Sequence, residues 1–169
     1  DLKALLRSMS SIFTGSSKGG GSTITQQLAK MMFPRRKLSK PELIVQKMKE
    51  WVIATKLEKL YTKEEILALY LNKYDFLNLA VGIKSAAQIY FNRGQDSLKI
   101  EQAAMLIGMA KNSSLFNPIR FEERTKQRRN VVLNQMVKYG YLEQKKCDSL
   151  KALPLGLSFR PEDHNDGLA

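Results

Sequence analysis

Signals that start and stop helices recur along almost the whole chain, and they constrain the fold more than any other feature. Ser39–Glu42 and Thr62–Glu65 each show the spacing of a capping box, in which two side chains satisfy unpaired N–H groups at a helix start. Pro34 and Gly140 stand where a helix has to end. No segment alternates apolar and polar residues over a useful length, as a half-buried strand would. We therefore predict a single all-α domain.

The apolar spacing and these signals predict the extent of each helix. The predicted helices span residues 2–13, 22–33, 40–60, 62–71, 80–91, 98–111, 121–139 and 142–150. We place the domain at residues 1–152 and interpret residues 153–169 as an irregular tail or linker that frays from Pro154 onward. The Gly/Ser-rich loop over residues 14–21 and the segment 31–38 are expected to be the most mobile.

The net positive charge of the chain indicates which classes of partner it can bind. Lysine and arginine outnumber aspartate and glutamate by 28 to 16 in the 169 residues, a net charge of +12. This excess favours polyanions, anionic membrane surfaces or phosphorylated substrates without choosing among them. No apolar run approaches the roughly 20 residues that span a bilayer. The chain starts at Asp1 rather than Met, so we expect that an upstream anchor has been lost. The single Cys147 is interpreted as structural.

Residues 19–30 read Gly-Gly-Gly-Ser-Thr-Ile-Thr-Gln-Gln-Leu-Ala-Lys. Glycines let backbone N–H groups approach a ligand closely, and the start of the following helix adds unpaired N–H groups and partial positive charge. The segment is therefore expected to cradle an anion, although a flexible linker capped by Ser22 or Thr23 is the plainer alternative. The side chains that can bind sugars or phosphates there are Ser22, Thr23, Thr25, Gln26, Gln27 and Lys30.

Lys47 and Glu50 lie on one face of the predicted helix 40–60, together with Ala54 and Glu58. A lysine three residues from a glutamate is most often a solvated ion pair worth a few tenths of a kcal/mol. The alternative interpretation is a charged pair at a binding site. We favour this alternative because of the sequence that surrounds the two residues.

Four segments, in order, resemble signature motifs of the peptidoglycan glycosyltransferases of glycosyltransferase family 51. These enzymes occur in class A penicillin-binding proteins and as monofunctional cell-wall glycosyltransferases. Residues 22–30 resemble the second motif, residues 46–72 the third, and residues 82–91 the fourth. The fifth is resembled by residues 101–106, 116–118 and 128–136. We interpret the fourth and fifth, which are mostly small and apolar, as packing.

The resemblance implies a lysozyme-like fold that polymerises lipid II into glycan strands and releases undecaprenyl pyrophosphate. It implies phosphate contacts by Lys30 and Lys47, with weaker ones by Lys49 and by Arg36 in the basic segment 35–37. Glu50 would assist at the leaving group or orient the lysines. A divalent cation, Mg²⁺ or Mn²⁺, could also stabilise the departing pyrophosphate, with unknown ligands.

The chain departs from the family pattern in four places, one of which is Leu77-Asn78, where the family often has a glycine. The family's general base is a glutamate in a first motif, which would lie about ten residues upstream of Asp1. This chain is therefore predicted to lack polymerase activity by itself. Gln46 replaces an arginine before the motif lysine, and Glu42 replaces another arginine, so positive charge near the expected phosphates is reduced.

The implied setting is the outer face of the bacterial cytoplasmic membrane, with an upstream helix as anchor and a transpeptidase domain as a candidate C-terminal neighbour. The implied partners are lipid II, the growing glycan strand and the membrane surface, without nucleic acid. Eight apolar residues could either form a patch that enters the membrane surface or pack in the core. They are Leu5, Leu6, Met9, Ile12, Phe13, Met31, Met32 and Phe33.

Two other functions stay open. The net charge and the basic run Arg124–Arg129 would suit a helical nucleic-acid-binding module, although no reading helix or aromatic platform is recognisable. A lysozyme-like lytic enzyme would also need carboxylates, but the match at residues 22–30 favours synthesis.

Overall fold

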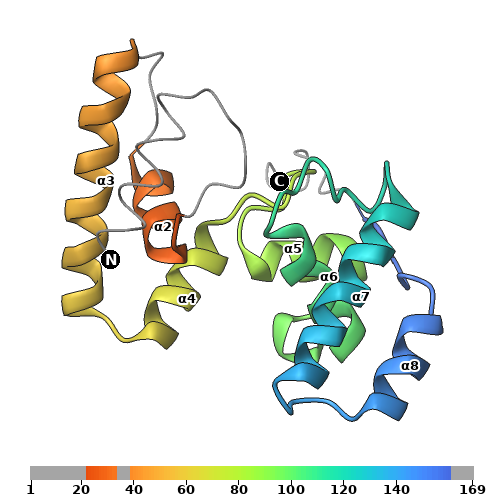
Figure 1. Cartoon of the computed structure of the whole chain (residues 1–169). Helices are drawn as coiled ribbons and strands as arrows, with labels where there is room; N and C mark the ends of the chain where they lie inside the picture. Colours follow the sequence, from red (N-terminus) through yellow and green to blue (C-terminus); the bar gives the residue numbers. More distant parts are fainter. Residues whose placement is uncertain (1–21, 34–38, 161–169) are drawn as a thin grey trace. The chain divides into compact units, whose positions relative to one another are not determined.

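The computed structural model describes residues 22–33 and 39–160. The regular secondary structure of these residues is helical, with no strand among them (Figure 1). The all-α prediction is confirmed. The elements are α2 (Ile24–Met32), α3 (Lys40–Leu60), α4 (Lys63–Lys73), α5 (Ile83–Phe91), the 3-10 turn η1 (Gln95–Ser97), α6 (Ile100–Met109), α7 (Glu122–Lys138) and α8 (Gln144–Ala152). The predicted helix 2–13, the loop 14–21 and the basic segment 35–37 lie outside the described residues.

Both predicted capping boxes form. The backbone N–H of Ser39 donates to Glu42 Oε2 over 2.7 Å, and that of Thr62 donates to Glu65 Oε2 over 2.7 Å. The Ser39 hydroxyl donates to the same Glu42 oxygen. Hydrogen bonds from Ser39 lower the pKa of Glu42, and those from Thr62 lower the pKa of Glu65, because they stabilise the carboxylate form. The starts of α3 and α4 therefore follow from local sequence alone.

The chain divides into two compact units, residues 1–73 and 74–169. In the first unit α2 packs against both α3 and α4. Its described core consists of Leu28, Ala29, Ala54, Leu57, Ile66 and Tyr70. Helix α3 also leaves Val45, Met48 and Val52 exposed at spacings of three and four, so one apolar stripe of this helix faces outward.

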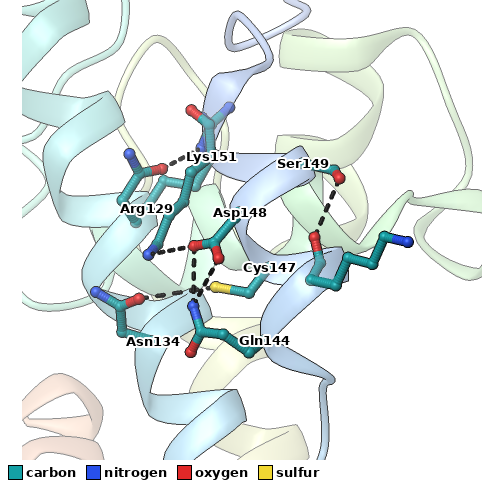
Figure 2. A network of polar contacts seen from close by, with 9 residues as sticks. Arg129, Asn134, Gln144, Cys147, Asp148, Ser149 and Lys151 are labelled. Atoms are coloured by element: carbon teal, nitrogen blue, oxygen red, sulfur yellow. Dashed lines mark hydrogen bonds and ion pairs between the residues drawn. The ribbon is translucent and has the colours of Figure 1, made fainter.

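In the second unit α6 packs along α7, and α8 packs on α7 (Figure 1). Ala104, Leu133, Leu142 and Cys147 form a buried cluster there. The interpretation of Cys147 as structural is confirmed, because its side chain is fully buried in this cluster and its Sγ lies 3.7 Å from Asn134 Oδ1 (Figure 2). Gly140 has a φ of 78° just after α7, the left-handed conformation that a terminating glycine supplies.

The loop before α5 is held in an unusual conformation. Leu77, Asn78 and Leu79 have consecutive positive φ angles of 66°, 53° and 66°. Such angles strain residues other than glycine. The Tyr90 hydroxyl donates to the Phe76 carbonyl over 2.7 Å and accepts from Asn78 Nδ2 over 2.9 Å, so the core of α5 stabilises the loop. Burial raises the pKa of Tyr90, which keeps the hydroxyl protonated as this donor.

The prediction that the chain frays from Pro154 is wrong for residues 154–160. This segment has no regular secondary structure, but Leu155 is buried. The backbone N–H groups of Ser158 and Arg160 donate to the carbonyls of Tyr90 and Ile89 over 2.9 and 2.8 Å. Carbonyls in the last turn of a helix have no partner within it. The segment therefore caps α5, and the packed structure extends beyond the predicted boundary at residue 152.

Candidate functional site

The anion cradle is predicted at the start of α2, and the Thr23 cap seen there is also what the plainer alternative predicted. Thr23 is the N-cap, and its hydroxyl accepts from the backbone N–H of Gln26 over 3.2 Å. Ser22 precedes the cap and is half-buried. The first turn of the helix leaves N–H groups without intrahelical partners, and the helix dipole adds partial positive charge. The first turn contains no acidic residue to offset this charge.

A buried ion pair adjoins this helix start. Lys47 Nζ lies 2.9 Å from Glu50 Oε2 and donates to Ser22 Oγ over 3.2 Å. Glu50 is only 1% exposed, whereas Lys47 is half-buried. Removing a carboxylate from water is costly unless a partner compensates it. The plain alternative of a solvated surface pair is therefore excluded for Lys47 and Glu50.

In this arrangement Lys47 keeps one N–H donor that can bind a ligand. An ammonium group has three N–H donors, and two are used by Glu50 and Ser22. Glu50 supplies a fixed negative charge that holds the ammonium beside the start of α2. Within the first unit, one lysine donor, one hydroxyl and the N–H groups of a helix start thus converge, which suits a phosphate oxygen.

The other predicted residues of this segment divide by role. Gln27 is held from both ends, since its Nε2 donates to the Ser22 carbonyl over 3.3 Å and its Oε1 accepts from Tyr70 Oη over 3.2 Å. Thr25 is buried, and Gln26 is half-buried. Sequence reasoning missed Tyr70 as a support of Gln27. The only signal was its place in the Tyr-Leu-Asn run, which indicates no function by itself.

The remaining predicted cations are exposed or lie outside the described residues. Lys30 is exposed in the last turn of α2. Lys49 is exposed on α3, two positions from Lys47, and therefore points to another side of the helix. Glu58, which shares the predicted helix face with Lys47 and Glu50, is exposed. Arg36 lies outside the described residues.

A cavity of about 540 Å³ lies beside Glu50 on α3. It is lined by Phe33, Val45, Gln46, Met48, Lys49, Glu50, Val52 and Ile53. Phe33 is 47% exposed and Met48 is 59% exposed. Of the predicted apolar patch, residues 31–33 are described, and Met32 and Phe33 are exposed. The first unit therefore combines a charged pair with an exposed apolar groove.

The described residues offer little to a divalent cation. Residues 22–33 and 39–160 contain no group of three or more His, Cys, Asp or Glu side chains that could hold a metal ion. Hard cations such as Mg²⁺ bind through several oxygens. Glu50 is the one carboxylate of the described cluster, and its Oε2 already accepts from Lys47.

The segments that resemble the fourth and fifth motifs lie in the second unit and pack there, as predicted. Ala86, Ala87, Tyr90 and Phe91 of α5 are buried. Part of the basic run that suggested nucleic-acid binding makes internal contacts. Arg129 is fully buried, and the Arg128 guanidinium lies over the Phe116 ring while its Nε donates to the Gly108 carbonyl. Arg129 is thus unavailable to phosphates, whereas Arg128 is half-buried and uses one of its five N–H donors.

Comparison with known proteins finds matches over most of the chain. The family model described as "Transglycosylase" matches residues 1–137. Penicillin-binding protein 1A of Escherichia coli K12 is 39% identical over 148 residues, covering 88% of this chain and 17% of that protein. Penicillin-binding protein 2a of Streptococcus pneumoniae is 41% identical over 133 residues, covering 79% of this chain and 18% of that protein.

The fold is shared with a solved structure. The crystal structure of penicillin-binding protein 1A from Haemophilus influenzae aligns with a TM-score of 0.51 at 23% identity, over 81% of this chain and 17% of that chain. The present chain thus spans less than a fifth of the length of these relatives. Among residues 22–33 and 39–160, no helix has the length and apolar character needed to cross a bilayer.

Proposed function

Because this chain belongs to the transglycosylase family, we propose that it forms part of a peptidoglycan glycosyltransferase that polymerises lipid II. The observation that carries the proposal is the Ser22–Lys47–Glu50 cluster at the start of α2. In the reaction, the 4-hydroxyl of an acceptor sugar attacks the anomeric carbon of the growing chain, and undecaprenyl pyrophosphate leaves. Lys47 and the first-turn N–H groups of α2 would stabilise the charge of that leaving group.

Glu50 is assigned a positioning role. Its carboxylate is buried and bonded to Lys47, so it has neither the exposure nor the free geometry of a base for an incoming hydroxyl. The general base is proposed to come from the upstream first motif. The 169-residue chain is therefore expected to bind lipid II without polymerising it. The remaining predicted contacts, from Lys30, Lys49 and Arg36, stay predictions.

A fluorescently labelled lipid II titration tests the assignment of Lys47. Lys47→Gln is expected to weaken binding at least tenfold, because a charge-assisted contact to phosphate contributes about 1.5–3 kcal/mol. The matched control is Lys59→Gln, which removes the same charge from the exposed end of α3. Equal weakening by both variants would show that binding depends only on overall charge.

The exposed apolar groove supports a membrane-surface location beside the substrate. Phe33, Met48 and Val52 line it, and the net charge of +12 would add attraction to anionic lipids. We expect the double variant Phe33→Ser, Met48→Ser to bind vesicles of phosphatidylglycerol several-fold more weakly. Val131→Ser, at an exposed apolar position of α7, is the control. Unchanged vesicle binding by the double variant would refute the membrane contact.

The remaining parts of the proposal concern the whole protein. They are an upstream anchor, a setting on the outer face of the cytoplasmic membrane, a following transpeptidase domain and a requirement for Mg²⁺ or Mn²⁺. The +12 charge supports the membrane setting, because it favours binding to anionic lipids. A chelator titration of the protein extended upstream to include the first motif tests the cation: polymerisation that continues in EDTA would remove it from the mechanism.

A further inference from the structure

The second unit contains a cavity of about 710 Å³ that lies wholly outside the Lys47 site. Its walls come from three segments: the turn after α5, the start of α6, and the extended segment after α8. The lining residues are Phe91, Asn92, Arg93, Gly94, Ser97, Lys99, Glu101, Gln102, Leu153, Pro154, Leu155, Gly156 and Ser158. The volume falls within the usual range for small-molecule sites.

Gln102 contributes a hydrogen-bond donor with no partner. Its residue is 7% exposed, and its Oε1 accepts from the backbone N–H of Lys99 over 3.0 Å. Its amide nitrogen makes no hydrogen bond to any described residue. No fully enclosed side-chain nitrogen or oxygen among the described residues lacks a partner, so this nitrogen is accessible in the cavity that Gln102 lines. This accessible nitrogen can therefore donate to an acceptor on a ligand in the cavity.

The charge around this donor favours an anion. Arg93 and Lys99 line the cavity and are exposed, while Glu101 is its one acidic residue. The charge of Glu101 is partly offset by the buried guanidinium of Arg129, with which it interacts. The ten-residue helix α6 begins at Ile100 and adds first-turn N–H groups and partial positive charge.

The other part of the cavity is apolar. Phe91 and Leu155 are buried, and Leu153 and Pro154 complete this surface. The buried Arg129 donates to the carbonyls of Leu153 and Pro154 over 2.8 and 2.9 Å, so this wall is rigid. We propose that the cavity binds an amphipathic small anion, a phosphate or carboxylate joined to an apolar group, with Gln102, Lys99 and Arg93 on the anionic end.

Titration of the isotope-labelled 169-residue chain, followed by amide NMR, tests this site. The probes are phenyl phosphate and 4-phenylbutyrate, with benzyl alcohol as the neutral match. Saturable shifts confined to residues 92–102 and 153–158 are expected for both anions, with a dissociation constant on the order of 1 mM for probes of about ten non-hydrogen atoms. Comparable binding of benzyl alcohol, or shifts spread over lysine-rich surfaces elsewhere, would overturn the proposal.

Gln102→Glu is the decisive variant. The carboxylate keeps an acceptor for the Lys99 N–H, as in a capping box, but it removes the donor and repels an anion. We expect at least tenfold weaker binding of phenyl phosphate, against no change for Lys145→Gln, an exposed lysine of α8 outside the cavity. Wild-type binding by Gln102→Glu would refute the site.

The double variant Arg93→Gln, Lys99→Gln tests the site separately from the capping contact, because both side chains are exposed at the rim. About tenfold weaker binding is expected. Affinity equal to that of Lys145→Gln would also refute the site, whatever the stability of Gln102→Glu.

Discussion

Lys47 in the first unit and Arg129 in the second are both cations with buried partners, and they use their donors differently. Arg129 is fully buried, and its guanidinium donates to the carbonyls of Lys151, Leu153 and Pro154 and to Asn130 Oδ1. Figure 2 shows Arg129 beside the end of α8. Four of its five N–H donors are thus used. Lys47 keeps one donor and partial exposure.

The difference distinguishes a structural cation from a binding one. Burial lowers the pKa of Arg129, and Glu101 partly counteracts this. Because the normal arginine pKa is so high, the group stays charged. Its guanidinium donates hydrogen bonds to carbonyls at the end of α8, which have no partners within the helix. The buried charge at the other site is the Glu50 carboxylate, and the lysine it holds remains available to a ligand.

The largest expected effect is on Arg129. Arg129→Met would remove four hydrogen bonds from a fully buried guanidinium, and hydrogen bonds to charged groups contribute about 1.5–3 kcal/mol each. We expect a loss of at least 3 kcal/mol in the free energy of unfolding of the second unit, measured by urea denaturation. Arg129→Lys should lose less, because an ammonium can serve some of the carbonyls. A Met variant as stable as the wild type would show that these contacts carry no net stability.

A smaller effect is expected at the Lys47 pair. Lys47→Met would remove the ammonium that lies 2.9 Å from the buried Glu50 carboxylate. Removing one partner of a fully buried ion pair costs about 3–5 kcal/mol, and we expect a smaller loss here because Lys47 is half-buried. Adding Glu50→Leu should restore much of the stability, while lipid II binding stays lost. A double-mutant cycle in urea measures the coupling. Additive losses would show that the two side chains act independently.

The smallest expected effect is pH-dependent. The pKa values of Glu42 and Glu65 are lowered by their capping-box hydrogen bonds, from an ordinary value of 4.5. Their contribution is therefore present above about pH 4.5 and lost as the pH falls through the lowered values. Helix content measured by circular dichroism should fall over that range, and less so in the Glu42→Gln, Glu65→Gln variant. Identical acid profiles would argue against the boxes as the cause.

Most helix boundaries could be predicted because their causes are local. Capping boxes, apolar spacing and a terminating glycine act within a few residues, and α3 matches its predicted span of residues 40–60. The tail could not be predicted in this way. Ser158 bonds to Tyr90 through backbone groups far apart in the chain, and a backbone hydrogen bond carries no signature in residue type.

At the candidate site, too, some features could be predicted from the sequence and others depend on the tertiary structure. The spacing of Lys47 and Glu50 and the Gly-rich start of α2 are properties of the sequence, and so is the family resemblance. Only the packing of α2 on α3 decided that Glu50 is buried and that Ser22 reaches Lys47, because burial depends on which helix covers which face. The same holds for Gln102, whose unpaired donor acquires meaning only from the cavity that three separate segments enclose.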